Sequence, residues 1–465
     1  MKLIQLGSQT GLKTFARLCM AAGLCAGLGA VIGCTGPVPD HNAEATAAAI
    51  TGVGDAIVFQ NKAQPINEII ADETKLTLID AGRLALKNDP EIQAALARVR
   101  VAQAGAQQAR LLPNPVFNIV VRAHVNGGPA ILTPSIAEDL IGILEIPGKS
   151  NAADHRLRQS VSNAMTIVLG TLTDVQTKYV EIQTIEASVG ILAERKTLME
   201  KLLEVAKARL KSKEGIGLDV TAIEAQILNL ETDSDQKNID LHNARLAMAR
   251  MIGSPLNKAM WAVEAWVLPP TVSSAQPLWI RAALQNRPEI QAQKWELAAL
   301  GDDLKLTNFA PWEGATAGIE AERDGGWSLG PAGSTPVPIF DTGWAKKKKA
   351  SAEVLGARHE LTKSQRAVIE QVRRTYDEYA ASIKVLARTR DSLIPLQEKR
   401  RTQAEAAYKI GETDLTTVLV AQEELQDARI KLVDLQSKTS IAYYNLVRSI
   451  GGPGIEKMID VSKKP

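Results

Sequence analysis

The chain has 465 residues, of which 45% are hydrophobic and only 4% aromatic, and its 54 basic side chains nearly balance its 52 acidic ones. This balance gives no support to nucleic-acid binding, which requires a basic surface. The length alone would suggest about three globular domains, but long tracts of Ala, Leu, Gln, Glu and Lys favour long helices packed as coiled coils.

The first forty residues have the form of an export signal. Lys2, Lys13 and Arg17 precede an apolar stretch over residues 18–33, as in a secretory signal peptide. Its removal would take away three positive charges and no negative ones, so the net charge would change from +2 to −1.

The apolar stretch ends in Val-Ile-Gly-Cys, which places a cysteine at Cys34. Ordinary cleavage near Ala30 is the alternative to cleavage before this cysteine. Cys19 and Cys25 lie within the signal, so Cys34 would be the only mature cysteine, and neither a disulfide nor a cysteine metal site could form. The next segment, to residue 76, reads as a tether.

A repeated heptapeptide indicates an internal duplication. Asn-Asp-Pro-Glu-Ile-Gln-Ala begins at Asn88, and Asn-Arg-Pro-Glu-Ile-Gln-Ala begins at Asn286, 198 residues later. An Asn or Asp cap followed by Pro and Glu is typical of a helix start. The predicted segments are a signal peptide (1–33), a tether (34–76), a first repeat (77–255), a linker (256–276), a second repeat (277–453) and a tail (454–465).

In each repeat the hydrophobic period changes to two, which predicts a β-hairpin. Apolar and polar residues alternate over 117–125 and return over 136–146, so the first hairpin is expected at about 116–146. The second is expected at about 314–340, with its return strand over 334–340.

Strands of 9–11 residues with one apolar and one polar face are typical of a transmembrane β-barrel, although a soluble sheet packed on helices also alternates. Trp312 and Trp344 at one end of the second hairpin and Trp327 at the other resemble an aromatic girdle. Charged side chains on the polar faces suit a water-filled lumen better than a dry core: Arg122, His124, Glu320 and Glu322.

After each hairpin the sequence predicts a long helix and a return helix. The first long helix spans 150–213 and carries a seam with 4-3-4-3 spacing, formed by Val161, Met165, Val168, Leu172, Val175, Tyr179 and Ile182. The expected return helices are 219–252 and 414–450, and the second long helix, 345–409, contains Pro395 as a possible kink.

Four strands cannot close a barrel, and open strand edges are not tolerated in lipid. Two copies would give eight strands with a filled interior, and three would give twelve with room for a lumen. We therefore expect three copies.

Ordered, duplicated motifs carry a family resemblance. They are Asp89-Pro90 and Arg287-Pro288, Ile-Pro-Gly-Lys at 146–149, Pro-Ile-Phe-Asp-Thr-Gly at 338–343, and Ala-Tyr-Lys-Ile-Gly-Glu-Thr-Asp-Leu at 407–415 followed by Ala421-Gln422. With these motifs, residues 77–453 resemble the outer-membrane efflux protein family of TolC-like channels. The end of the signal at Cys34 resembles a bacterial lipobox, which implies an acylated cysteine.

The resemblance implies a mainly α fold with a membrane β-barrel: a homotrimer whose 12-stranded barrel takes four transmembrane strands per chain and continues into a long α-helical coiled-coil barrel. It implies an outer-membrane, lipid-anchored exit duct that extends into the periplasm. Its partners would be outer-membrane lipid, a periplasmic adaptor and an inner-membrane pump of the resistance-nodulation-division type. The heavy-metal cation efflux branch is one possible affiliation.

The resemblance also implies site residues. Adaptor docking falls on the inter-helix turns, at Gly215, Gly217, Leu218, Tyr408, Gly411 and Thr413, where the glycines would supply the left-handed backbone of a tight reversal. Many relatives close a periplasmic gate with an acidic residue before the Ala-Gln pair, and here that position is Val420, followed after the pair by Glu423. Glu224, before Ala225-Gln226, is the nearest acidic substitute.

No constellation predicts an enzyme. The histidines are scattered, no phosphate-binding loop is present, and neither a cofactor nor a metal site is expected. The lysine run 346–349 is read as a solvated or headgroup-facing anchor, with substrate binding as the alternative. Two functions remain beside the efflux duct: the outer-membrane component of type I protein secretion, and a non-conducting structural coiled-coil lipoprotein.

Overall fold

The computed structural model describes residues 43–51, 57–60, 75–123, 127–213, 215–256, 258–270 and 275–456. The expected signal peptide, Cys34 and His124 lie outside these residues. The described chain divides into two compact units, one formed by 102–154 with 299–351 and the other by the remaining residues. Within the described residues no helix has both the length and the apolar composition needed to cross a membrane.

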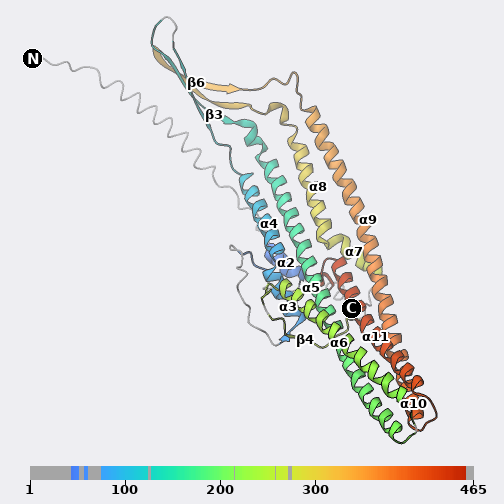
Figure 1. Cartoon of the computed structure of the whole chain (residues 1–465). Coiled ribbons are helices and arrows are strands. Elements are labelled where there is room, and N and C mark those ends of the chain that lie inside the picture. The colour runs from blue at the N-terminus through green and yellow to red at the C-terminus, as the bar shows by residue number, and fades with distance from the viewer. Residues whose placement is uncertain are drawn as a thin grey trace, which may run out of the picture. The chain divides into compact units, whose positions relative to one another are not determined.

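The first unit contains a four-stranded antiparallel sheet (Figure 1). Its strands are β2 (Val116–Arg122), β3 (Ile131–Asp139), β5 (Thr316–Asp324) and β6 (Gly326–Ser334), in the spatial order β2-β3-β5-β6. The two hairpins are therefore joined through β3 and β5, in a register that places Ile136 opposite Ile319. Within the chain, β2 and β6 are the edges of this sheet.

The pairing of β3 with β5 depends on Gly318. A Cβ at this position would overlap the carbonyl oxygen of Ile136 and lie 2.7 Å from the Cα of Ala137. Only glycine therefore allows the two hairpins to approach this closely.

Both return strands differ from their predicted ranges. β3 ends at Asp139, and helix α5 begins at Leu140 instead of near residue 150, because the Asp139 carboxylate accepts a hydrogen bond from the Gly142 N–H at 2.9 Å and caps the helix. In the second hairpin the turn at Gly325, with φ +70°, starts β6 at once. The segment 335–340, predicted as strand, is not one. Pro336 and Pro338 cannot donate ladder hydrogen bonds there.

The second unit is mainly helical, and three pairs of helices in the chain repeat with a constant offset. α3 (Leu78–Asn88), α4 (Pro90–Gln108) and α6 (Gly217–Met251) are matched by α7 (Gln276–Asn286), α8 (Pro288–Leu306) and α11 (Leu415–Ser449). Both ends of each later helix lie 198 residues after those of its counterpart. The offset of the repeated heptapeptides is thus also the offset of the helices.

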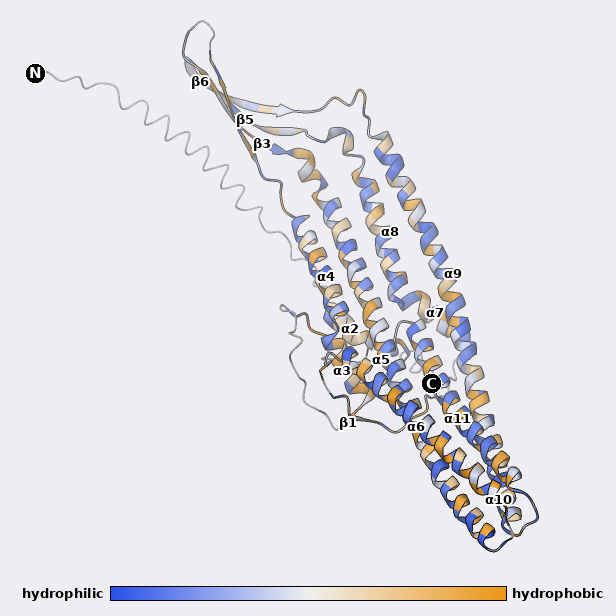
Figure 2. Ribbon diagram, in the orientation of Figure 1, coloured by the Kyte–Doolittle hydropathy of each residue, from blue (hydrophilic) through white to orange (hydrophobic). Residues whose placement is uncertain are grey.

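The first long helix is α5 (Leu140–Lys211), with 72 residues. All seven residues of the predicted seam are buried in it: Val161, Met165, Val168, Leu172, Val175, Tyr179 and Ile182. Figure 2 shows hydrophobic and hydrophilic residues mixed along the helices, as expected for helices that bury one stripe.

The second long helix is interrupted where the sequence contains Pro395. α9 (Trp344–Arg388) is followed by a π-helical turn, η2 (Thr389–Leu393), and then by α10 (Ile394–Lys409). Proline lacks the N–H that would continue the α-helical ladder, and a wider turn is a common way to accommodate it.

A short parallel pair joins the N-terminal part of the chain to the linker between repeats. β1 (Lys75–Leu76) pairs with β4 (Ala262–Val263). The Tyr179 hydroxyl of α5 donates a hydrogen bond to the Leu76 carbonyl at 2.9 Å and accepts one from the Glu264 N–H at 2.8 Å. One buried side chain thus fixes both short strands to the long helix. Before them, within the predicted tether, residues Ala43–Thr51 form helix α2.

Candidate functional site

The two inter-helix turns lie at one end of the second unit, where α5, α6, α10 and α11 share a hydrophobic core (Figure 1). One turn joins α5, which ends at Lys211, to α6, which begins at Gly217; the other joins α10, which ends at Lys409, to α11, which begins at Leu415. Both turns therefore have the same length and occupy equivalent positions in the two repeats.

In one of the two turns the left-handed residue is not where the glycine pattern placed it. Gly411 has φ +77°, as expected, but in the first turn the left-handed residue is Lys213, with φ 64°. Lys213 is the counterpart of Gly411 at the 198-residue offset. The N–H of each donates to the carbonyl three residues earlier, at 3.1 Å in both turns.

Gly215 and Gly217 do not supply the left-handed backbone, so that part of the prediction is wrong. The Gly215 N–H donates to the Arg209 carbonyl at 3.0 Å, and Gly217 is the first residue of α6. No heavy atom would meet a Cβ on Gly217 or Gly411, so these two positions face open space.

The turns present apolar side chains outward. Ile216, Leu218 and Ile410 are 59%, 72% and 71% exposed, and Thr413 is half-buried. Apolar side chains gathered on an exposed turn favour contact with a partner over a purely solvated role. The prediction from sequence named Leu218 but missed Ile216 and Ile410.

Tyr408, in contrast, is buried and connects the two turns. Only 3% of it is exposed, its ring lies 4.5 Å from the Arg209 guanidinium carbon, and its carbonyl accepts a hydrogen bond from Arg209 at 3.0 Å. Burial raises the pKa of the Tyr408 hydroxyl. Its side chain is therefore placed to hold one turn against the other.

Asp414 begins the last helix with a side-chain cap. Its carboxylate accepts hydrogen bonds from the Thr417 hydroxyl at 2.7 Å and the Thr417 N–H at 3.0 Å, and these bonds lower the pKa of Asp414. The start of α11 is thus fixed next to Gly411 and Thr413.

The gate candidates are spread over two helices. Glu224 on α6 forms an ion pair with Lys207 at 3.3 Å, while Val420 and Glu423 lie exposed on α11. Because α6 and α11 begin 198 residues apart, the structural counterpart of Glu224 is Gln422 and not Val420. The constant offset in the sequence would have shown this.

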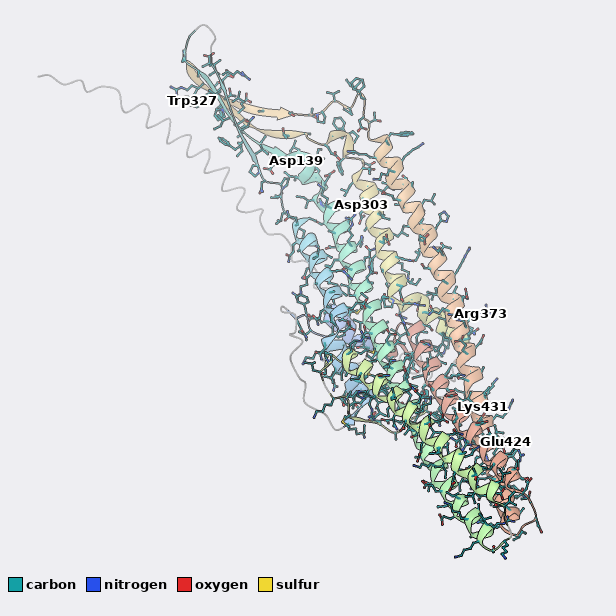
Figure 3. The ribbon with its side chains drawn as sticks, viewed as in Figure 1. Asp139, Asp303, Trp327, Arg373, Glu424 and Lys431 are labelled. Carbon is teal, nitrogen blue, oxygen red and sulfur yellow. The ribbon has the colours of Figure 1, made fainter. Side chains whose placement is uncertain are left out.

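Sequence reasoning missed a network of charges above the turns. Arg429 on α11 contacts Glu194 on α5 at 3.0 Å and Glu398 on α10 at 3.1 Å. Arg400 pairs with Glu424, which is labelled in Figure 3. The spacing of these arginines in the sequence gives no signal for the network, because its members lie on three helices and only the packing brings them together.

In the first unit the predicted lysine anchor is engaged with its neighbours. Lys346 pairs with Glu313 at 2.9 Å, Lys347 donates to the Asn308 side chain at 3.1 Å, and Lys348 lies 4.1 Å from the centre of the Trp344 ring. The three tryptophans of the predicted girdle are exposed, and Trp327 lies near the turn of its hairpin, away from Asp139 (Figure 3).

The repeated heptapeptide has a structural role. Asn88 at the end of α3 donates a hydrogen bond to the Ile252 carbonyl at 2.8 Å, beside Gly253, which has φ +84°. Asn286 occupies the same place beside Gly451, with φ +108°. The heptapeptides and the glycine motifs that ended each repeat in the sequence therefore meet in the fold.

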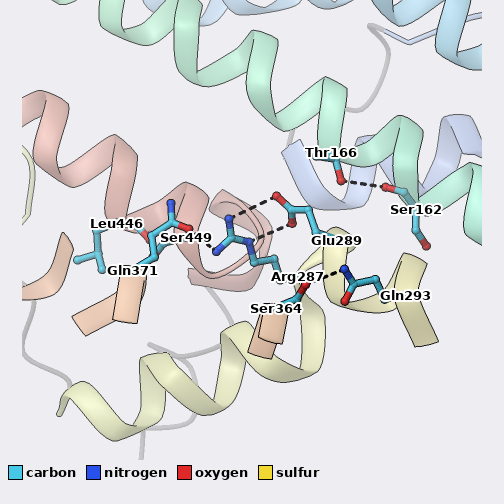
Figure 4. Close-up of polar contacts among 9 residues, drawn as sticks. All are labelled: Ser162, Thr166, Arg287, Glu289, Gln293, Ser364, Gln371, Leu446 and Ser449. Atoms are coloured by element: carbon cyan, nitrogen blue, oxygen red, sulfur yellow. Dashed lines mark hydrogen bonds and ion pairs between the residues drawn. The ribbon is translucent and has the colours of Figure 1, made fainter. Parts of the chain in front are cut away.

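The two heptapeptides differ at one position, and the structure uses that difference. Asp89 caps α4 by accepting a hydrogen bond from the Glu91 N–H at 2.7 Å. Arg287 instead pairs with Glu289 at 3.0 Å and donates to Gln371 on α9 at 2.8 Å (Figure 4). These contacts hold helices together and do not form a reactive site.

No metal centre is seen in the part of the chain that the structure describes: there, no three His, Cys, Asp or Glu side chains converge to hold an ion.

The family model for outer membrane efflux proteins matches residues 279–452. The match covers the second repeat, from α7 through α11, and this part of the chain is similar to the family.

Two relatives match most of the length of the chain. Outer membrane efflux protein BepC of Brucella suis is 23% identical over 395 residues, which cover 81% of this chain and 85% of BepC. Cobalt-zinc-cadmium resistance protein CzcC of Cupriavidus metallidurans is 21% identical over 383 residues, which cover 81% of this chain and 90% of CzcC.

Solved structures show the same fold at low sequence identity. The outer membrane protein VceC from Vibrio cholerae aligns with a TM-score of 0.66 and 18% identity, over 81% of this chain and 96% of VceC. The outer-membrane channel OprN aligns with a TM-score of 0.67 and 16% identity, over 90% of this chain and 98% of OprN. The mainly helical, TolC-like fold predicted from the sequence is therefore confirmed.

Proposed function

We propose that this protein is the outer-membrane channel of a tripartite pump, a passive exit duct for small molecules or metal ions. The observation that carries the proposal is the open four-stranded sheet. Its apolar side chains Phe117, Ile119 and Val121 are 65%, 52% and 64% exposed, and the outer edges of its strands β2 and β6 pair with no strand within the described chain.

Such a sheet is a barrel segment that needs further copies. In lipid every backbone group must be paired, so β2 of one copy has to meet β6 of another. Three copies give twelve strands around a lumen wide enough for solute. The glutamates of β5, Glu320 and Glu322, would then face water in the lumen while its apolar side chains face lipid.

Ring closure can be tested with cysteine pairs, one on β2 and one on β6. We expect pairs in register to cross-link the purified protein into covalent trimers under oxidising conditions, while variants with only one of the two cysteines form no covalent trimers. Dimers as the largest product would point to an eight-stranded assembly and overturn the twelve-stranded one.

The channel itself is tested by conductance in a planar lipid bilayer. We expect single-channel steps from wild-type protein, and reversal potentials that shift when glutamates facing the lumen, Glu320 and Glu322, are replaced by Gln. An assembly that never conducts, in the closed or the chemically opened state, would favour a structural lipoprotein.

The exposed turns are proposed as the docking surface for a periplasmic adaptor. Two similar turns in each of three copies would offer six equivalent contacts, centred on Leu218 and Ile410 with Gly217 and Gly411 leaving space for a partner backbone. Gly217→Asp is expected to leave trimer assembly intact and to abolish export. Efflux at the wild-type level with unchanged adaptor cross-linking would refute this assignment.

The lipid anchor and the gate stay proposals as well. We expect acylated Cys34 at the mature N-terminus, and mass spectrometry that finds a free N-terminus elsewhere would contradict it. Val420, Glu423 and Glu224 are proposed to line the narrow end of the duct, so replacing Val420 by Asp is expected to change conductance there.

The substrate and the pump are proposed at the level of class only. CzcC is named for cobalt, zinc and cadmium resistance, whereas the name of BepC gives efflux without a substrate, so the two relatives leave the substrate class open. We favour a resistance-nodulation-division pump as the partner at the inner membrane. Loss of metal tolerance in a deletion strain, with unchanged drug tolerance, would select the metal branch.

A further inference from the structure

A cavity of about 230 Å³ lies between α5, α10 and α11, above the inter-helix turns. Residues from all three helices line it, among them Arg195 on α5, Arg401 on α10, and Gln426 and Arg429 on α11. A water molecule takes about 30 Å³ in the liquid, so the cavity has room for a small solute with several waters.

Three of the lining residues have buried N–H groups without an acceptor. Arg195 Nε, Arg401 Nε and Gln426 Nε2 make no hydrogen bond to any described residue, and Gln426 as a whole is only 5% exposed. Arg401 Nε forms an ion pair with the Glu405 carboxylate at 3.6 Å, a separation too long for a hydrogen bond. Unsatisfied buried donors are rare and costly, and each of these comes from a different helix.

The cavity lining is cationic. Arg195, Lys201, Arg401 and Arg429 contribute four positive charges, against one carboxylate, Glu194. That carboxylate is held by Arg429 at 3.0 Å, and the Glu405 carboxylate accepts a hydrogen bond from Gln422. The Arg195 Nη2 group donates to the Gln226 side chain at 3.4 Å, so the donors that still lack an acceptor are Arg195 Nε, Arg401 Nε and Gln426 Nε2.

We propose that this cavity, here called the arginine pocket (Arg195, Arg401, Gln426 and Arg429), binds a small oxyanion such as phosphate. Charge-assisted hydrogen bonds to an oxyanion are the strong ones, and guanidinium groups match its geometry. One bound anion would satisfy donors from three helices at once. Its occupancy would therefore stabilise the packing of α5 against α10 and α11.

The test uses the full-length protein in detergent and inorganic phosphate as the probe. Phosphate is titrated against sodium chloride at constant ionic strength, with binding followed by calorimetry and by the thermal midpoint of unfolding. Wild type is expected to show saturable binding and a rising midpoint. Arg401→Gln is expected to weaken binding by about tenfold or more, the effect of losing one charge-assisted hydrogen bond.

Arg400→Gln is the matched control, because it removes the same charge from the neighbouring position of α10. Arg400 pairs with Glu424 and does not line the cavity, so its variant is expected to bind phosphate like wild type. If both variants lost the same phosphate affinity, the loss would be explained by net charge alone, and the proposed site would be overturned.

Gln426→Glu supplies a carboxylate inside the pocket. It is expected to fold, to unfold at a midpoint no lower than that of wild type, and to lose the response to phosphate because the donors are already satisfied. Wild-type protein that shows no saturable phosphate binding would refute the proposal and leave a carboxylate of a neighbouring copy as the partner of these donors. None of these measurements depends on transport.

Discussion

Replacing Tyr179 by Phe removes one hydroxyl and leaves the rest of a fully buried ring in place. Two hydrogen bonds disappear: the one donated to the Leu76 carbonyl and the one accepted from the Glu264 N–H. Leu76 is only 1% exposed, so its carbonyl is left without water as a substitute. At about 1–2 kcal/mol for each buried group that loses its partner, the free energy of unfolding should fall by about 2–4 kcal/mol.

The loss should be local as well as global, because Tyr179 is the side chain that ties β1 and β4 to α5. We expect hydrogen exchange to accelerate in peptides that contain residues 75–78 and 262–264, while peptides from α10 and α11 stay protected. Thermal unfolding of the purified protein measures the loss of global stability. Tyr444→Phe is the matched control, since its hydroxyl makes no hydrogen bond within the described part of the chain.

The same hydroxyl predicts how stability depends on alkaline pH. Burial raises the pKa of Tyr179 from 10.0 to about 12, and the bond from the Glu264 N–H opposes part of that rise. A raised folded-state pKa stabilises the fold below the unfolded value, so this contribution is complete below pH 10 and is lost as the pH passes through about 12. A Tyr179→Phe variant that loses less than about 0.5 kcal/mol, with unchanged exchange at β1 and β4, would refute the role assigned to this hydroxyl.

Three further predictions follow from the turns and the sheet. Gly318→Ala should prevent β3 from pairing with β5 and should abolish trimer assembly, as measured by gel electrophoresis without boiling; assembled trimers would show that the sheet adapts. Gly411→Ala should lower the free energy of unfolding by about 1 kcal/mol, because alanine must adopt a left-handed backbone, whereas Lys213→Gly should be neutral or stabilising. The opposite order in denaturant unfolding would contradict the equivalence of the two turns. Asp414→Asn should keep the hydrogen bonds from Thr417 but should remove the part of the free energy of unfolding that wild type loses as the pH falls through the lowered pKa of Asp414. Identical profiles of unfolding free energy against acid pH in the two proteins would show that the cap does not cause this loss.

Local patterns in the sequence determined most of the helical architecture. The hydrophobic period of 3.5 along α5 correctly predicts that the seven seam residues are buried, because a helix has to bury one stripe against its neighbours. The 198-residue offset of the heptapeptides likewise equals the offset of three helix pairs. The first property depends on residues close in the sequence and the second on the likeness of two stretches of it, so both can be read without the fold.

The ends of strands and turns were decided by contacts that the sequence does not display. The Asp139 cap and the Gly325 turn moved the strand ends from their expected places, since a few local hydrogen bonds outweigh a weak alternation of apolar residues. In the first turn the left-handed position is set by where α5 ends, which is why it falls on Lys213 although two glycines stand nearby.

Long-range pairing was beyond the sequence altogether. The two hairpins pair through β3 and β5, which approach each other closely at Gly318. Nothing in the sequence distinguishes this glycine from the others. The donors of Arg195, Arg401 and Gln426 lie up to 231 residues apart in the chain, and only the packing of three helices brings them to one cavity. Sequence periodicity therefore fixes which face of each helix is buried, whereas tertiary structure alone decides which polar groups are buried together.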